Sequence, residues 1–110
     1  MRTTALAHVE AASALARMHK GRRITAPQLR SRRAELERLW QAIYVHAVSD
    51  ALLAQAAESA VAHALRAYDA VHLAGALSFR EGEDLSFACW DRELREAAAA
   101  HGLALVPEHL

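Results

Sequence analysis

Three acidic residues in this sequence lie where a solvent-exposed position explains them poorly. Asp69 lies inside the apolar run of residues 65–77, and Asp91 directly follows the apolar run of residues 85–90. Glu10 lies on the apolar stripe of a predicted helix. Carboxylates brought together repel one another unless a cation lies between them, and their oxygens suit Mg²⁺ or Mn²⁺. Such a site activates water and neutralises a phosphodiester, so its natural chemistry is hydrolysis of a nucleic acid backbone.

Each acid also has a structural explanation. An unpaired, desolvated carboxylate at Asp69 would be costly, so an N-cap position, an arginine or a metal ion must compensate it. Asp91 can be an ordinary N-cap for a helix over residues 92–101. Glu10 has no base three or four residues after it, so no local salt bridge explains it, although it could be an exposed glutamate on an alanine-rich helix. The sequence leaves these alternatives open.

Other catalytic chemistries have weaker support. The seven histidines are scattered, without paired spacing on one helix face or a cysteine partner, so a zinc site is not predicted. His72 could share the hydrogen-bond network of Asp69, but a buried structural histidine is the favoured interpretation. Cys89 beside Trp90 is interpreted as core filler rather than a nucleophile. No glycine-rich loop is present to hold a nucleotide phosphate.

The elements that must position the acids follow from periodicity and end signals. Thr3 or Thr4, then Thr25 with Pro27, and then Ser49 are predicted to start helices, and Gly102 to stop one. Helices are predicted over residues 5–20, 27–43, 50–63, 66–79 and 92–101, strands over 43–48, 85–90 and 103–106, and a charged turn over 81–84. This alternation predicts an α/β fold, a parallel sheet flanked by helices, in one domain over residues 1–110. Asp91 would then lie at the carboxyl edge of the sheet, where ligands usually bind.

Composition narrows the class of protein. The chain of 110 residues is 54% hydrophobic, enough for a modest core, and has no apolar run of membrane-spanning length. A lone Cys89 and the lack of a signal-peptide pattern predict a cytoplasmic protein without internal disulfides. Residues 17–38 carry eight bases and two acids, whereas residues 81–110 carry seven acids and two bases. The basic segment is compatible with attraction to a polyanion and equally with a solvated amphipathic helix.

Several motifs together resemble a known family. Residues 65–74 (LRAYDAVHLA), followed by residues 87–94 (FACWDREL) and 98–103 (AAAHGL), are similar to the C-terminal half of a PIN-domain ribonuclease of the VapC toxin type. Residues 8–17 (HVEAASALAR) resemble that family's first acid-bearing helix. The most specific piece is Tyr-Asp-Ala-Val-His-Leu-Ala at residues 68–74, and the resemblance covers essentially the whole chain.

This resemblance implies a PIN-like fold and Mg²⁺- or Mn²⁺-dependent endoribonuclease activity. It also implies a toxin role in a type II toxin–antitoxin pair, with RNA as substrate and a cognate antitoxin that blocks the site. Separately, the apolar stripe of the helices predicted over residues 5–20 and 27–43 is expected to be covered by another chain, either the antitoxin or a second copy in a homodimer. Glu10, Asp69 and Asp91 fall on three of the family's acidic positions, which implies that they are catalytic residues and metal ligands.

The chain also departs from the family pattern. In the family, an opening strand ends in a further acid some tens of residues before the helix that carries Glu10, and these 110 residues do not contain it. The chain is therefore expected to be N-terminally truncated and impaired as a nuclease. Smaller departures are Cys89, where Ser or Thr is frequent, and Ala64, where glycine often ends the preceding helix. A different class of function is a catalytically inactive remnant that serves as an antitoxin-binding or dimerisation module.

Overall fold

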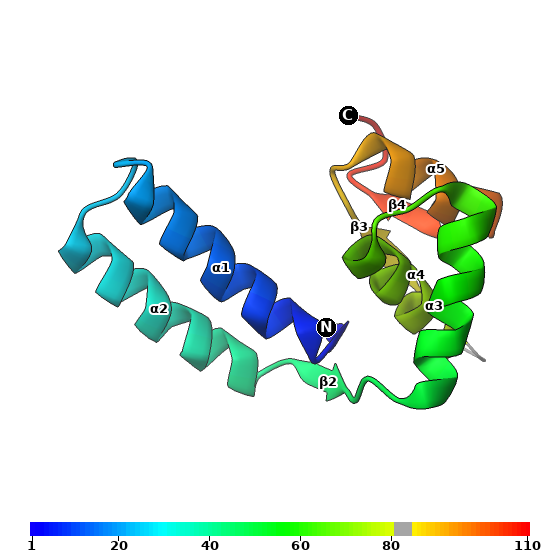
Figure 1. The fold of residues 1–110 in the computed structure, drawn as a ribbon, viewed down its shortest axis with the longest axis horizontal. Helices are drawn as coiled ribbons and strands as arrows, with labels where there is room; N and C mark the ends of the chain where they lie inside the picture. The colour runs from blue at the N-terminus through cyan, green and yellow to red at the C-terminus, as the bar shows by residue number, and fades with distance from the viewer. Residues whose placement is uncertain (81–84) are drawn as a thin grey trace. The chain divides into compact units, whose positions relative to one another are not determined.

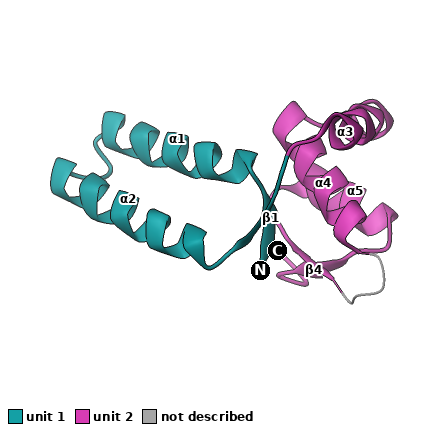
Figure 2. Ribbon diagram, turned by 90° about the horizontal axis from the view of Figure 1, so that it is seen from below, with its two compact units in different colours: residues 1–47 teal, residues 48–110 magenta. Residues whose placement is uncertain are grey.

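The computed structural model describes residues 1–80 and 85–110, which form two compact units, Met1–Ala47 and Val48–Leu110 (Figures 1 and 2). We call these unit 1 and unit 2. The charged turn expected at residues 81–84 lies outside the described residues.

Unit 1 is a helical hairpin closed by a pair of short strands. Its elements are β1 (Arg2–Thr4), α1 (Leu6–Lys20), α2 (Ala26–Gln41) and β2 (Tyr44–His46). The two helices run side by side (Figure 1), and β1 pairs in parallel with β2 so that Thr4 lies opposite His46. The hairpin is thus the crossover that a parallel strand pair requires.

Of the two helix starts predicted in unit 1, the one at Thr25 is confirmed and the one at Thr3 or Thr4 is wrong. Thr25 caps α2, because the Gln28 N–H donates to Thr25 Oγ1 at 3.2 Å and the Thr25 N–H donates to Gln28 Oε1 at 2.8 Å. The prediction that Thr3 or Thr4 caps the first helix was wrong. Both threonines lie in β1, and α1 starts after Ala5 without a side-chain cap. Thr3 and Thr4 instead pair with Val45 and His46 of β2, so their backbone is part of a strand rather than of a helix start.

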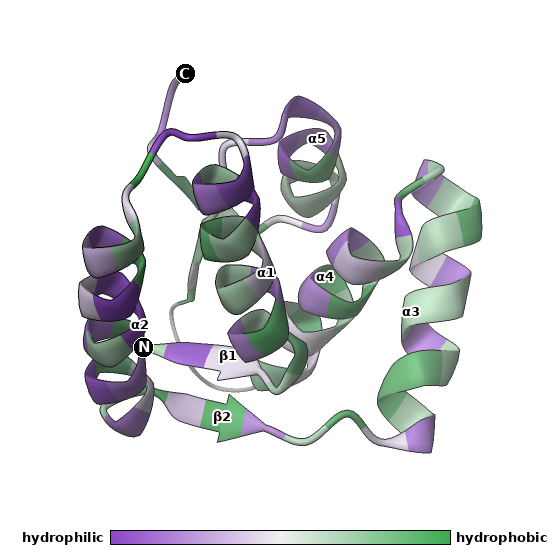
Figure 3. Cartoon of the chain, turned by 60° about the vertical axis from the view of Figure 1, so that its left-hand side comes forward, coloured by the Kyte–Doolittle hydropathy of each residue, from purple (hydrophilic) through white to green (hydrophobic). Residues whose placement is uncertain are grey.

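The hairpin helices bury little of their apolar surface. Neither α1 nor α2 has a buried residue, and α2 is hydrophilic along most of its length (Figure 3). Half-buried side chains supply the apolar contacts, among them Leu29, Leu36 and Trp40, whereas Val9 of α1 is 61% exposed. No helix within residues 1–80 and 85–110 is long and apolar enough to cross a membrane.

Unit 2 is built around one central helix. Its elements are α3 (Asp50–His63), α4 (Ala67–Phe79), β3 (Ser86–Ala88), α5 (Arg92–Ala100) and β4 (Ala104–Val106). Helix α4 packs against α3 and α5, and its Leu73 is fully buried. Ala70 and Ala74 are also buried in α4, where their small side chains allow close helix packing. Ser49 caps α3 as predicted, by accepting a hydrogen bond from the Leu52 N–H at 3.1 Å.

The expectation that the segment around Asp69 is packed on nearly every side was only partly correct. It describes the middle of α4, where residues 70, 71 and 73–76 are buried. It fails in the first turn, where Tyr68 is 53% exposed and Asp69 is half-buried. The helix begins at Ala67, so this turn extends beyond the part of α4 that its neighbours cover.

Parallel pairing was predicted correctly, but a single sheet was not. The described residues form two separate two-stranded sheets, β1 with β2 and β3 with β4. Each strand has three residues, shorter than predicted, and each pair is joined by helices of its own unit. Every strand therefore finds its parallel partner within its unit, across a local helical crossover.

Candidate active site

Asp91 is fixed at the start of α5, as its cap interpretation predicted. Its Oδ1 accepts a hydrogen bond from the Leu94 N–H at 3.0 Å, and its backbone carbonyl accepts one from the Arg95 N–H at 2.9 Å. The residue is exposed.

Asp69 occupies the equivalent end of α4. It lies in the first turn of that helix, two residues after Ala67, and is half-buried. The N-cap residue, Arg66, contributes no side-chain cap. The N-cap position that was expected as one compensation for this acid is therefore held by Arg66, and Asp69 lies three residues after it.

The thiol of Cys89 connects the two aspartates. Burial raises the pKa of Cys89, and the negative charges of Asp91 and Asp69 raise it further. A backbone hydrogen bond of Asp91 and the charge of Arg95 lower the pKa of this thiol. Both carboxylates thus act on the same sulfur, which indicates that they share one region of unit 2. A buried, protonated thiol also agrees with the interpretation of Cys89 as core filler.

Arg95 is a site residue that the sequence reading missed. Its side chain is buried, with Nη1 donating to the Cys89 carbonyl at 2.8 Å and Nη2 donating to the Glu108 carbonyl at 3.0 Å. The guanidinium therefore fixes the turn between β3 and α5 that carries Asp91. A signal was present in the sequence, because Arg95 lies on the face of α5 that buries Leu94 and Ala98.

Glu10, the third acid, belongs to α1 of unit 1, where it is half-buried. The two units are described separately, so the meeting of Glu10 with Asp69 and Asp91 stays a prediction. Within residues 1–80 and 85–110, no group of three or more His, Cys, Asp or Glu side chains is close enough to hold a metal ion. The structure places Asp69 and Asp91 in unit 2 and Glu10 in unit 1.

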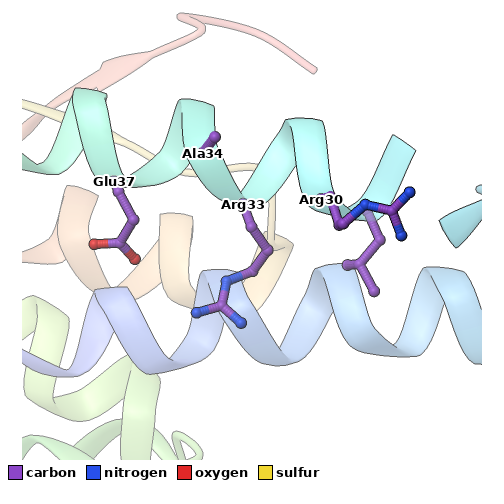
Figure 4. Close-up of a pocket in the computed structure, with 5 residues that line it drawn as sticks. Arg30, Arg33, Ala34 and Glu37 are labelled. Atoms are coloured by element: carbon purple, nitrogen blue, oxygen red, sulfur yellow. The ribbon is translucent and has the colours of Figure 1, made fainter. Parts of the chain in front are cut away.

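Unit 1 presents a basic hollow on α2. A pocket of about 360 Å³ is lined by Leu29, Arg30, Arg33, Ala34 and Glu37 (Figure 4). The Arg33 side chain extends from α2 toward the neighbouring helix in this view. Glu37 is engaged by His8 of α1, whose Nε2 lies 2.6 Å from Glu37 Oε1. The two guanidinium groups give the hollow the donors that bind phosphate oxygens.

Comparison with known proteins decides the family. No family model matches the chain. Two curated relatives from Mycobacterium tuberculosis, Ribonuclease VapC45 of strain CDC 1551 and Ribonuclease VapC49 of strain H37Rv, are each 35% identical to it over 105 residues. The matched region is 96% of this chain and 72% of each relative. The chain belongs to the VapC ribonuclease family.

The motifs that carried the resemblance also carry the site of this VapC chain. Residues 68–74 form the start of α4 with Asp69, and residues 87–94 form the turn with Cys89 and Asp91. Carboxylate oxygens are the donors that a hard divalent cation prefers. The like charges that raise the pKa of Cys89 are those that a cation between Asp69 and Asp91 would neutralise. The acids of unit 2 therefore fit such an ion.

Proposed function

We propose that this chain is a metal-dependent endoribonuclease and the toxin of a toxin–antitoxin pair, with Glu10, Asp69 and Asp91 holding Mg²⁺ or Mn²⁺. The observation that carries the proposal is that unit 2 places two carboxylates at helix N-termini, Asp69 in the first turn of α4 and Asp91 at the cap of α5. Family membership supports the reaction, because the two relatives are named ribonucleases.

The chain's own residues would prepare the site before substrate binds. Arg95 and the cap to Leu94 hold Asp91 in one orientation, and the first turn of α4 positions Asp69. A bound divalent ion would lower the pKa of a coordinated water and neutralise charge on the phosphodiester. The fixed orientation of these carboxylates matters because displacement of a metal ligand lowers both the metal affinity of the site and the rate of cleavage.

The basic segment of unit 1 would bind the RNA backbone. Arg30 and Arg33 flank one hollow of α2, and residues 17–38 carry six further bases. Phosphate contacts of this kind position a nucleic acid without reading its sequence. The antitoxin would cover this hairpin or the acids, and a second copy of the chain could cover the hairpin in a homodimer.

Cleavage of RNA by the 110-residue chain, with Mg²⁺, Mn²⁺ or EDTA, tests the activity. We expect slow cleavage that EDTA abolishes, because the fourth acid of the family pattern is not among these residues. Asp91→Asn keeps an equally good helix cap but removes the charge, so it should abolish cleavage without unfolding α5. Glu96→Gln, at an exposed acid of α5, is the matched control. Cleavage that is robust in EDTA, or that survives Asp69→Asn, would contradict the proposal.

The single cysteine gives a second readout that does not depend on activity. Thiolate formation can be followed by absorbance near 240 nm while the pH is raised. Because Asp91 and Asp69 raise the pKa of Cys89, added Mg²⁺ should lower the midpoint, and Asp69→Asn should lower it without Mg²⁺. A midpoint that Mg²⁺ leaves unchanged, together with no cleavage and intact antitoxin binding, would favour the catalytically inactive binding module instead.

A further inference from the structure

Two histidines of unit 2 face each other at the ends of different helices. His63 is the last residue of α3, and His101 follows the last residue of α5. Their Nε2 atoms lie 3.1 Å apart, with ring centroids 5.2 Å apart and ring planes inclined by 71°. Both rings are accessible to solvent. Neither histidine has a role in the proposed acid site.

Backbone hydrogen bonds define the two helix ends that carry these histidines. Helix α3 ends with Ala64 in the left-handed conformation, and the Ala64 N–H donates to the Ala60 carbonyl. Helix α5 ends in a Schellman motif, in which the Leu103 N–H donates to the Ala98 carbonyl at 3.1 Å and Gly102 has φ +79°. The Arg80 side chain also donates to the carbonyl of His101. The two imidazoles are thus presented by helix ends rather than by free loops.

This arrangement has the geometry of two ligands on one metal ion. Two imidazole nitrogens bound tetrahedrally at about 2.05 Å lie about 3.3 Å apart, with ring centroids about 5.2 Å apart. The observed Nε2 separation of 3.1 Å and centroid separation of 5.2 Å are close to both values. Rings that pointed directly at each other along a hydrogen bond would have a longer centroid separation for the same contact.

We propose that His63 and His101 form a two-histidine site for a transition-metal dication of the zinc class. Neutral imidazole nitrogens suit such ions, whereas hard Mg²⁺ prefers carboxylate oxygens, so this site differs in chemistry from the proposed acid site. Water would fill the open coordination positions, because the described residues hold no cluster of three such ligands. A bound ion would link the C-terminal ends of α3 and α5. Sequence spacing could not reveal this site, because the two histidines are 38 positions apart.

Thermal unfolding of the full chain with zinc chloride tests the site. An ion that binds the folded state raises Tm, and at free zinc about five times Kd the rise should be about 4–8 °C for a domain of this size. His63→Gln or His101→Gln should weaken zinc binding about tenfold or more, as even changes behind the ligands cost about 10–100-fold. His109→Gln, at a side chain that is 90% exposed, is the control and should keep the full rise. Magnesium chloride at the same concentration should not reproduce it through these histidines.

Histidine side-chain NMR of the unaltered protein provides the second measurement, which does not depend on whether a variant folds. Zinc should shift the Nε2 resonances of two of the seven histidines, and these resonances should be absent from the spectra of the two variants. An equal rise in Tm for the wild type and for the double variant His63→Gln/His101→Gln would overturn the proposal. Shifts confined to other histidines, or no shift at millimolar zinc, would overturn it as well.

Discussion

The two units of this VapC chain differ in how they are held together. In the described residues, the buried apolar side chains lie almost all in unit 2, around α4, and Ile24 is the one that unit 1 contributes. Unit 1 instead relies on half-buried contacts such as Leu36 and Trp40, on a three-residue strand pair and on the contact between His8 and Glu37. Burial of apolar area is the main stabilising term, so unit 2 has a core of its own, whereas the helices of unit 1 bury little apolar area.

The two units also differ in their charge. Unit 1 carries nine bases and three acids, whereas unit 2 carries four bases and ten acids. A basic hairpin suits contact with a polyanion, and an acidic unit suits a divalent cation. Under the proposed function, the basic unit would hold RNA or a partner and the acidic unit would hold the metal ion.

Removal of a core side chain from each unit should give the largest contrast. Leu73→Ala truncates a fully buried side chain of α4 and should lower the free energy of unfolding by about 2–5 kcal/mol. Leu36→Ala truncates a half-buried side chain of α2 and should cost clearly less, since part of that area is already in water. Urea unfolding at constant pH measures both. Equal costs would contradict the view that only unit 2 has its own core.

Truncation of the half-buried aromatic of the hairpin should weaken partner binding. If an antitoxin or a second copy covers α1 and α2, Trp40→Ala should weaken the complex at least tenfold, or about 1.4 kcal/mol. Leu53→Ala, at a residue of α3 that is 45% exposed, is the control. Co-expression with the neighbouring small open reading frame, followed by size-exclusion chromatography and calorimetry, measures the effect. A chain that stays a lone monomer under every condition would count against a covered hairpin.

A glycine at the end of α3 should stabilise unit 2 further. Ala64 has φ +53°, which costs a residue with a Cβ about 1 kcal/mol relative to glycine. Ala64→Gly should therefore raise the free energy of unfolding by about 1 kcal/mol. Ala57→Gly, at an exposed position inside the same helix, should lower it by a similar amount. Both variants replace alanine with glycine. If both changed the free energy of unfolding in the same direction, the explanation from the left-handed conformation of Ala64 would be refuted.

The smallest expected effect is a pH dependence of unit 1. Burial, and then the charge of Arg2, lower the pKa of His46 in β2 below 6.5. The unfolded chain therefore binds the proton first, so this contribution to stability is full above pH 6.5 and is lost as the pH falls toward the folded-state pKa. His46→Gln should flatten the dependence of the urea midpoint between pH 7.5 and 5. His19→Gln, at an exposed histidine of α1, should leave the slope unchanged.

Local signals in the sequence predicted the local structure well. Thr25, Ser49 and Asp91 cap the helices that they were expected to cap, because capping depends on a few adjacent residues. The small apolar residues of α4 likewise predicted its burial. The family was also predicted from short motifs, because these motifs contain the acids at the start of α4 and α5.

Features that depend on distant contacts were not predictable in this way. The role of Thr4 in β1 depends on its pairing with β2, about forty residues later. Arg95 reads as one of many surface arginines until its two carbonyl partners are known. The ligand roles of Glu10, Asp69 and Asp91 remain predictions, supported for the two aspartates by their common effect on Cys89.

The contact of Arg95 with the Glu108 carbonyl has a practical consequence for anyone who produces this protein. The last residues of the chain are attached, through one guanidinium, to the turn that carries Asp91. An affinity tag or fluorescent fusion directly after Leu110 is expected to disturb the hydrogen bond between Arg95 and the Glu108 carbonyl. A label at this end therefore needs a flexible spacer before RNA cleavage by the labelled protein is interpreted.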